Sequence, residues 1–250
     1  MPQRVLVTAG AAGIGREIAR AFKAAGATVF VCDIDDPGLA SARGDGLIAA
    51  RCDMSRREEI ERMVPAAVEA LGGLDVLVNN AGVAGLTLPV DQYPPDDWDR
   101  VIAINLTGMF DVTRLAIPHL KQSPAGVVVN LASIAGRFGF ANRSPYAASK
   151  WAVIGFTKTL AIELGPWKIR ANAIAPGAVA GDRIERVFAG RAQLSGRSVE
   201  EVRAEAMAVQ SIKAMVDPKD IAQLAVFLAS PAAKAISGQV IPIDNDRQVA

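Results

Sequence analysis

A tyrosine and a lysine four residues apart, Tyr146 and Lys150, indicate chemistry most directly in this sequence. At this spacing in a helix, both side chains lie on one face. A free tyrosine has a pKa of about 10 and is therefore a poor base near neutral pH. A neighbouring ammonium favours the phenolate, and a shift of about two to three units, or about 3–4 kcal/mol, would suffice. The pair predicts acid–base chemistry by Tyr146.

Each of these residues also has an ordinary structural interpretation when taken alone. Tyr146 fits a helix start, and Lys150 fits a solvated helix position. Ser133, which precedes Tyr146 by 13 residues, fits a cap at a strand end. Asn105, in a long helical pattern, fits a core residue that hydrogen-bonds the backbone. These alternatives remain open until the residues are considered as a set.

A glycine-rich turn, Thr8-Ala9-Gly10-Ala11-Ala12-Gly13-Ile14-Gly15, joins the first predicted strand to the first predicted helix. Glycines let the backbone approach a pyrophosphate, and the helix N-terminus supplies free N–H groups. Ordinary tight turns use glycine as well. Asp33, 20 residues after Gly13, ends the next predicted strand, where a carboxylate accepts hydrogen bonds from adenosine ribose hydroxyls. A loop residue or a cap is the alternative for Asp33.

Asp33 also predicts which cofactor is bound. A 2′-phosphate would be repelled there, and the neighbours Ala12 and Ile34 offer no cation to offset the repulsion. We therefore expect NAD rather than NADP.

The elements that must position these residues alternate along the whole chain. Strands are predicted at Arg4–Thr8, Thr28–Asp33, Leu47–Cys52, Leu74–Asn79, Gly126–Leu131, Ile169–Ile174 and Gln239–Ile243. Helices are predicted at Ile14–Ala25, Arg56–Leu71, Asp96–Leu120, Tyr146–Leu164 and within Lys219–Ala229. Continuous apolar strands between helices indicate an α/β fold with a single doubly wound parallel sheet, Rossmann-like, of about seven strands, with helices on both faces.

We expect residues 1–250 to form one domain, because no linker, repeat or low-complexity tract interrupts the alternation. The exception is a charged stretch, Gly181–Asp217, which is predicted to be helical in two pieces. It follows the sixth strand, where an insertion is placed to act as a lid over a ligand crevice.

Composition excludes several functions. The chain is 51% hydrophobic and 21% charged with a net charge of +1, and it has no basic block, so we expect neither nucleic acid nor a membrane as partner. Two cysteines and a single histidine, His119, offer no zinc cluster, and no metal is expected. Cys32 and Cys52 are expected to be buried reduced thiols, with a redox pair as the alternative. We also expect no leader and no membrane-spanning stretch, and a cytoplasmic location.

Taken together, the motifs resemble those of the short-chain dehydrogenase/reductase family over nearly the whole chain. The family's Thr-Gly-x-x-x-Gly-x-Gly turn is matched by Thr8, Gly13 and Gly15, with Ala9 in place of the first glycine. The other matches are Asp53 after the third strand, Asn79-Asn80-Ala81-Gly82, Asn105, Ser133, the Tyr146-x-x-x-Lys150 signature and Pro176-Gly177. Any one motif is weak, but the ordered set is specific.

The resemblance implies a catalytic tetrad and a cofactor site. Tyr146 takes the proton of a substrate hydroxyl while hydride passes to nicotinamide C4, and Ser133 holds the same oxygen. Lys150 binds the nicotinamide ribose and passes the proton onward through a water near Asn105. The implied cofactor-binding residues are Gly10, Gly13, Ile14, Gly15, Asp33, Ile34, Asp53, Met54, Asn80, Ala81, Gly82, Tyr146, Lys150, Pro176, Gly177 and Val179.

Two positions depart from the family's pattern. The family often has threonine two residues after the position of Val179, where this chain has Gly181. The family's C-terminal Asp-Gly-Gly is Asp244-Asn245-Asp246 here. These changes affect the nicotinamide-side contacts and the tail geometry.

The substrate pocket is predicted between the Ser133–Tyr146 loop, Ala84–Gly85 and the lid. Phe138, Phe140 and Asn142 are candidates for its walls. The lid's arginines (Arg183, Arg186, Arg191, Arg197 and Arg203) are offset by Asp182, Glu185, Glu200, Glu201 and Glu205, so charge does not identify an anionic substrate. We expect NAD-dependent interconversion of a small secondary alcohol, of sugar, polyol or hydroxy acid type, and its ketone.

Two other functions use the same fold. A catalytically idle NAD-binding regulator would not need Ser133, so the intact tetrad disfavours it. A nucleotide-sugar epimerase or dehydratase shares the Tyr146-x-x-x-Lys150 signature but needs a larger C-terminal substrate domain.

The predicted helix Tyr146–Leu164 also indicates self-association. It lacks a clear polar face, and a helix that is apolar nearly all round is buried on both sides. Small residues such as Ala148, Ala152 and Gly155 allow close approach, and the family commonly pairs this helix and the Asp96–Leu120 helix with their copies. We therefore expect a homotetramer, with a dimer as the second choice.

Overall fold

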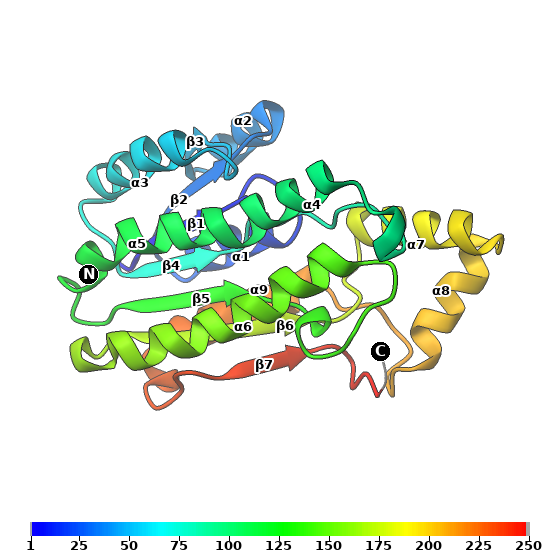
Figure 1. Cartoon of the computed structure of the whole chain (residues 1–250). Helices are drawn as coiled ribbons and strands as arrows, with labels where there is room; N and C mark the ends of the chain where they lie inside the picture. Colours follow the sequence, from blue (N-terminus) through cyan, green and yellow to red (C-terminus); the bar gives the residue numbers. More distant parts are fainter. Residues whose placement is uncertain (1, 249–250) are drawn as a thin grey trace.

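Seven parallel strands form one sheet in the order β3-β2-β1-β4-β5-β6-β7 in the computed structural model, which describes residues 2–248 (Figure 1). The strands are β1 (Arg4–Thr8), β2 (Thr28–Asp33), β3 (Ile48–Arg51), β4 (Val76–Asn79), β5 (Val127–Leu131), β6 (Arg170–Pro176) and β7 (Val240–Ile243). The chain moves outward from β1 to β3 and then returns to place β4 beside β1. This reversal is the switch point at which doubly wound sheets bind ligands.

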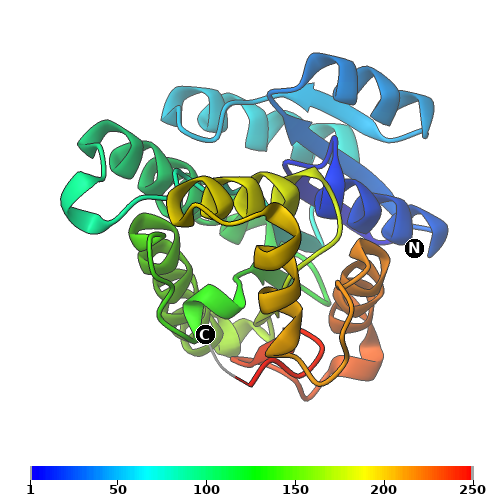
Figure 2. The same ribbon diagram turned by 90° about the vertical axis from the view of Figure 1, so that its right-hand side faces the viewer.

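Helices cover both faces of the sheet. One face carries α1 (Gly13–Ala24), α2 (Asp36–Gly44) and α9 (Pro218–Ala229). The other carries α3 (Arg57–Leu71), α4 (Pro95–Ile102), α5 (Gly108–Leu120) and α6 (Ser144–Leu164). Two further helices, α7 (Asp182–Ser195) and α8 (Val199–Ala208), stand beyond the carboxyl ends of the strands (Figures 1 and 2).

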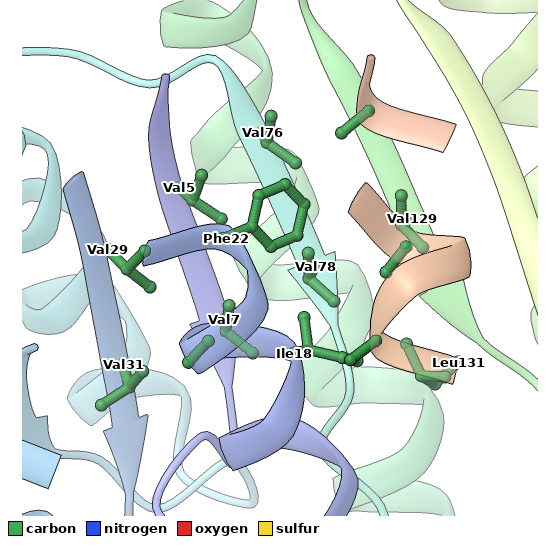
Figure 3. Close-up of a cluster of buried hydrophobic side chains, with 14 of the residues drawn as sticks. Val5, Val7, Ile18, Phe22, Val29, Val31, Val76, Val78, Val129 and Leu131 are labelled. Carbon is green, nitrogen blue, oxygen red and sulfur yellow. The ribbon is translucent and has the colours of Figure 1, made fainter. Parts of the chain in front are cut away.

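The strands read as continuous apolar runs because both of their faces are buried. In β1, Val5 and Val7 lie toward α1, where they contact the cluster of Ile18 and Phe22 (Figure 3). Leu6, between them, belongs to the cluster on the opposite face. Burying each such side chain contributes about 1.5–3 kcal/mol. The two hydrophobic cores, one on each face of the sheet, hold the carboxyl ends of the strands in place at one edge of the sheet.

The predicted strands and their parallel order are confirmed, with boundaries shifted by up to two residues. Helix α2 was not predicted, because it is short and buries only Leu39 and Ala42. The single long helix predicted at Asp96–Leu120 is divided by a wider π-helical turn, Ala103–Thr107. The two predicted pieces of the Gly181–Asp217 insertion are α7 and α8.

The helical unit Pro95–Leu120 meets the length and composition of a membrane span. It has 26 residues and a mean hydropathy of 1.3 over its most apolar window, contrary to the expectation that no such stretch exists. In this fold it lies on the sheet, where Val112, Ala116 and Leu120 are fully buried in the core. Apolar core helices of this kind pass the same test as membrane spans.

Candidate active site

A cavity of about 620 Å³ lies at the carboxyl edge of the sheet, and residues of α7 line it. Most of the residues predicted from the sequence line it together. These are Gly13, Ile14, Gly15, Asp33, Ile34, Asp53, Met54, Asn80, Ala81, Gly82, Ser133, Tyr146, Lys150, Pro176, Gly177 and Val179. The structure therefore brings the candidate catalytic and cofactor residues into one cavity.

Two predicted residues, Gly10 and Asn105, lie behind the cavity wall. A Cβ on Gly10 would lie 2.7 Å from Cβ of Val31, so this glycine allows close packing of the turn on β2. Asn105 is fully buried, and its Oδ1 accepts a hydrogen bond of 2.7 Å from the N–H of Val83, which does line the cavity. Both residues shape the wall from behind.

The first turn approaches its neighbours as closely as a glycine-rich cradle requires. A Cβ on Gly15 would collide with the carbonyl of Ala9 and the side-chain amide of Asn80. Ala9, where the family has glycine, has a φ of +50°, a left-handed conformation that costs a residue with a Cβ about 1–2 kcal/mol. The turn is therefore retained at the cost of strain at Ala9.

Hydrogen bonds tie this turn to the segment after β4. The Thr8 hydroxyl accepts bonds of 3.0 Å from the N–H groups of both Asn80 and Ala81. The Asn80 amide donates to the carbonyls of Thr8 and Ala9. The matched Thr8 and Asn80 thus hold the two sides of the switch point together.

The cradle fits a dinucleotide. Helix α1 starts after Ala12 with no side-chain cap and no acidic residue in its first turn, so its N–H groups are available to phosphate oxygens. At the β2 end, Asp33 accepts hydrogen bonds from the N–H groups of Ala11 (3.1 Å) and Ile34 (2.8 Å), which hold its carboxylate at the cavity wall. Asp53 lines the same end, and although burial raises its pKa, hydrogen bonds from Ser55 hold it below its usual value.

Tyr146 and Lys150 project from the first turns of α6 into the cavity. The Nζ of Lys150 lies 5.8 Å from the Tyr146 ring centre and donates a 2.7 Å hydrogen bond to the carbonyl of Leu131. Burial acts to raise the pKa of Tyr146, but the positive charges of Lys150, Arg183 and Arg143, together with the Ser133 hydroxyl, hold it below its usual value. Burial lowers the pKa of Lys150. The surroundings of Tyr146 therefore favour the phenolate.

Ser133 fits both of the interpretations that the sequence allows, a cap at a strand end and a residue of the catalytic site. Its hydroxyl accepts a 3.1 Å hydrogen bond from the N–H of Ala135 and so caps the short turn Ile134–Gly136. The residue also lines the cavity beside Tyr146. The cap holds the side chain in one position at the cavity wall.

Asn105 lies in the π-helical turn and bonds the neighbouring segment from both ends of its amide. Besides accepting from the Val83 N–H, it donates to the Val83 carbonyl (3.0 Å) and to the Ser149 hydroxyl (3.1 Å). The backbone-bonding alternative for this residue is therefore realised. Because its Oδ1 is only 3.3 Å from a Cβ placed on Gly82, Asn105 also fixes the wall next to Lys150.

The substrate side differs in part from the prediction. Phe140 lines the cavity, but Phe138 and Asn142 do not, and Ala84 and Gly85 line a smaller adjoining hollow of about 280 Å³. Asn142 instead takes a turn conformation with φ of +62°, and its carbonyl accepts from Leu88. The loop turns at Asn142, so the next residue, Arg143, enters the cavity in its place.

Two arginines of this wall were missed by sequence reasoning. Arg143 is 6% exposed, and its guanidinium carbon lies 4.7 Å from the Tyr146 ring centre. Arg247 reaches the cavity from the tail after β7. The sequence signal for Arg143 was its place three residues before Tyr146, whereas nothing local marked Arg247.

The two departures from the family's pattern have conformational reasons. Gly181 precedes α7 with φ of +133°, where a threonine would be strained. Asn245 and Asp246 both take left-handed conformations, φ of +57° and +56°, which Asn and Asp tolerate better than most residues. The tail therefore keeps a glycine-like turn, and it bonds the loop after α8 through the carbonyls of Asn245 and Asp246.

Comparison with known proteins indicates an oxidoreductase with a Rossmann-like fold. A family model described as "Enoyl-(Acyl carrier protein) reductase" matches residues 9–245. D-beta-hydroxybutyrate dehydrogenase of Cupriavidus necator is 39% identical over 247 residues, covering 96% of this chain and 95% of the relative. The chain belongs to the short-chain dehydrogenase/reductase family.

Two solved structures superpose closely. NAD+-bound xylitol dehydrogenase has a TM-score of 0.91 at 31% identity, covering 96% of this chain and 97% of that one. A variant of actinorhodin polyketide ketoreductase with NADPH has a TM-score of 0.92 at 34% identity, covering 98% and 96%. The comparisons support an alcohol dehydrogenase or ketone reductase with a nicotinamide cofactor, and the two structures carry different forms of that cofactor.

Proposed function

We propose that this protein is an NAD-dependent dehydrogenase that interconverts a small secondary alcohol and its ketone, with Tyr146 as the general acid–base. The observation that carries the proposal is the single cavity that holds Tyr146, Lys150 and Ser133 at one end and Asp33 at the other. A protein that only bound the cofactor would not need a tyrosine whose pKa is lowered by Lys150 and two arginines.

In the oxidative direction, NAD+ held by the Gly13–Gly15 turn and Asp33 would supply the two-electron acceptor for the hydride that leaves the carbinol carbon. The Tyr146 phenolate takes the hydroxyl proton, so that the alcohol becomes a ketone and Tyr146 becomes a neutral phenol. Ser133 donates a hydrogen bond to the same oxygen and holds it near Tyr146. Lys150 stabilises the phenolate and returns the proton toward solvent. Reduction of the ketone follows the reverse path.

Asn105 acts in this scheme by position. Its amide holds Val83 and, across Gly82, the wall beside Lys150. We assign it the placement of the proton path that leaves Lys150. Helices α7 and α8 form the lid that covers the substrate.

The choice of NAD over NADP depends on the β2 end of the cavity. Asp33 presents a carboxylate to the ribose hydroxyls, and the adjacent Ile34 is exposed and carries no charge. A 2′-phosphate would meet the carboxylate with no cation to balance it, because none of the arginines lining the cavity belongs to the Asp33 segment.

A panel of secondary alcohols, polyols and hydroxy acids, assayed with NAD+ and with NADP+ at the reduced-nicotinamide absorbance, tests the proposal. We expect turnover of at least one small secondary alcohol and a preference for NAD+. NADH binding without turnover of any alcohol, or of its ketone in reverse, would favour the idle regulator instead. Equal use of NADP+ would show that the interpretation of Asp33 is wrong.

The enzyme is a homotetramer in this proposal, with a dimer as the smaller alternative. Large apolar side chains are exposed on adjacent helices: Phe110 of α5 (45%), and Trp151 (52%) and Ile162 (78%) of α6. Light scattering should give four times the 26.2 kDa chain mass, and Ala152→Glu should dissociate the assembly. A clean monomer would refute the proposed oligomer.

We also place the protein in the cytoplasm in this proposal. The buried thiols of Cys32 and Cys52 fit a reducing compartment.

A further inference from the structure

Five arginines line the substrate end of the cavity, and we call them the arginine cluster: Arg143, Arg183, Arg186, Arg191 and Arg247. They come from three segments that are far apart in the sequence. The first is in the loop before α6, the next three are in α7, and the last is in the tail after β7. Their convergence is a property of the fold, because neither the lid nor the tail alone would create it.

No member of the cluster has a carboxylate partner within 4.0 Å among residues 2–248. The acids close enough to act on Arg191 and Arg247 are Glu205 and Asp244. Each of them contacts a different arginine: Glu205 pairs with Arg197 at 2.5 Å, and Asp244 lies 4.0 Å from Arg137.

The acids that line the cavity leave the cluster with excess positive charge. Asp33 and Asp53 belong to the opposite end, beside β2 and β3. Among the described residues, Asp182 is the one other acid that lines the cavity, and it stands against the five arginines of the cluster. The substrate end therefore has a local positive charge, although the whole chain is nearly neutral.

In the sequence, the acids of the lid balance its arginines in number, so the sequence did not reveal this excess of positive charge. Arg197, between α7 and α8, bonds Glu205, and Arg203 of α8 bonds Glu185 of α7, and all four side chains are exposed. These paired arginines do not line the cavity. The lid thus holds two kinds of arginine, and only the paired kind is neutralised.

Without a bound ligand, the cluster lowers the stability of the protein. The Nε atoms of Arg143 and Arg247 are buried without a hydrogen-bond partner. The guanidinium carbons of Arg191 and Arg247 lie 5.7 and 5.5 Å from the centre of the Phe140 ring. Burial lowers the pKa of Arg191, and the positive charge of Arg247 lowers it further. Arg143 is buried, Arg191 and Arg247 are half-buried, and Arg183 and Arg186 are exposed. Unpaired like charges at the first three positions destabilise the fold unless a ligand completes them.

We propose that the arginine cluster binds the carboxylate of a small hydroxy acid, whose carbinol carbon is oxidised beside Tyr146. This inference rests on the proposed function and narrows its substrate to one class. A guanidinium matches a carboxylate with two parallel hydrogen bonds. Since Arg143 lies 4.7 Å from the Tyr146 ring, the acid group is placed only a few bonds from the reacting carbon.

The cofactor's phosphates are the competing ligand for these arginines. The dinucleotide cradle, however, is at the N-terminus of α1, beside β1 and β2. Arg143 and Arg247 follow β5 and β7, on the opposite half of the sheet. Arg183 contacts a predicted cofactor residue directly, since it donates a 2.5 Å hydrogen bond to the Gly82 carbonyl, whereas Arg191 and Arg247 lie together beside Phe140. Arg191 and Arg247 are therefore the members to substitute.

The test compares acids with their neutral amides on the wild-type enzyme and on the double variant Arg191→Gln, Arg247→Gln. The probes are 2-hydroxybutyrate, 3-hydroxybutyrate and 4-hydroxypentanoate, each with its primary amide. We expect wild-type kcat/KM to favour at least one acid over its amide about 10- to 100-fold, the effect of charge-assisted hydrogen bonds. The double variant should lose that preference while its affinity for NADH, measured by fluorescence, stays within twofold.

The matched control is Arg197→Gln, Arg203→Gln, which removes the same charge from the same lid outside the cavity. It should keep the preference for the acid. An equal loss in the control and the double variant would overturn the inference, because the effect would then come from net charge or lid stability. A fall in NADH affinity that parallels the loss of acid turnover would also overturn it, by assigning the cluster to the cofactor.

Failure of this inference is distinguishable from failure of the proposed function. Turnover of neutral secondary alcohols as efficient as that of every acid would leave the dehydrogenase standing and overturn the carboxylate site. If nothing is turned over, the proposed function falls, and calorimetry of butyrate and butyramide on the NADH complex still decides the site. Tighter binding of butyrate that the double variant abolishes would support it. Equal binding of the two, or tighter binding of propyl phosphate, would overturn it.

Discussion

The two ends of the cavity are built by different means. At the Asp33 end, backbone N–H groups, glycines and short side chains from consecutive elements form the cradle. At the other end, long arginine side chains reach in from a loop, the lid and the tail. The first end is coded by a local motif. The second exists only once distant segments have folded together.

This difference explains why one end carries a motif that is recognisable in the sequence and the other does not. A dinucleotide has the same phosphates and ribose in every enzyme, so a fixed backbone cradle serves it. Substrates differ, and side chains on loops and lids change without disturbing the sheet. Tyr146 lies where a bound cofactor and a substrate would meet. Its pKa is lowered by Lys150, Arg183, Ser133 and Arg143, none of which belongs to the Asp33 end.

Removing the group at the meeting point should have the largest effect. Tyr146→Phe keeps the ring but deletes the proton carrier, so kcat for alcohol oxidation should fall about 10²- to 10⁴-fold or more. NADH affinity should stay nearly unchanged, because the phenol is not a main cofactor anchor. Steady-state assays and fluorescence titration measure the two. The matched control is Tyr93→Phe, whose hydroxyl bonds Asp97 outside the cavity; near-normal turnover by Tyr146→Phe would contradict the mechanism.

A change confined to the Asp33 end should alter cofactor choice and leave substrate choice intact. Asp33→Ser with Ile34→Arg removes the repulsion and adds a phosphate partner, so the NADP+/NAD+ ratio of kcat/KM should rise about 10- to 100-fold. Asp36→Ser, which removes a nearby exposed carboxylate outside the cavity, should not change this ratio. If the Asp33 variant instead changed the ranking of alcohols, the two ends would not be separable.

The smallest effect concerns strain at the cofactor end. Because Ala9 has a φ of +50°, Ala9→Gly should raise the free energy of unfolding by about 0.5–1 kcal/mol after the loss of its Cβ contacts. Ala12→Gly is the control: with a φ of −148° it gains no relief and should lower stability by a similar amount. Urea denaturation at one protein concentration measures both. A free energy of unfolding lower for Ala9→Gly than for the wild type would mean that the turn is not strained at Ala9.

The same contrast shows how far the sequence could lead. Continuous apolar runs located the strands and helical apolar patterns located most helices, because core burial dictates both. The cradle was predictable since Gly13, Gly15 and Asp33 keep fixed spacings around one strand. Helix α2 was missed because its packing face is only two residues wide.

The arginine cluster could not be read from the sequence. Counting acids against arginines in Gly181–Asp217 gave balance, since pairing such as that of Arg203 with Glu185 depends on how α7 meets α8. Arg247 enters through a turn at Asn245 and Asp246 whose left-handed conformations were not predicted. Long-range convergence of this kind has no local pattern.

The pH dependence of alcohol oxidation tests the central claim, that Tyr146 is the base and its surroundings favour the phenolate. Since the folded-state pKa is lowered, kcat/KM for oxidation should rise with pH and level off at an apparent pKa below 10. Ketone reduction, which needs the phenol, should fall over the same range. A flat oxidation profile, or a midpoint at or above the ordinary pKa of tyrosine, would contradict the account.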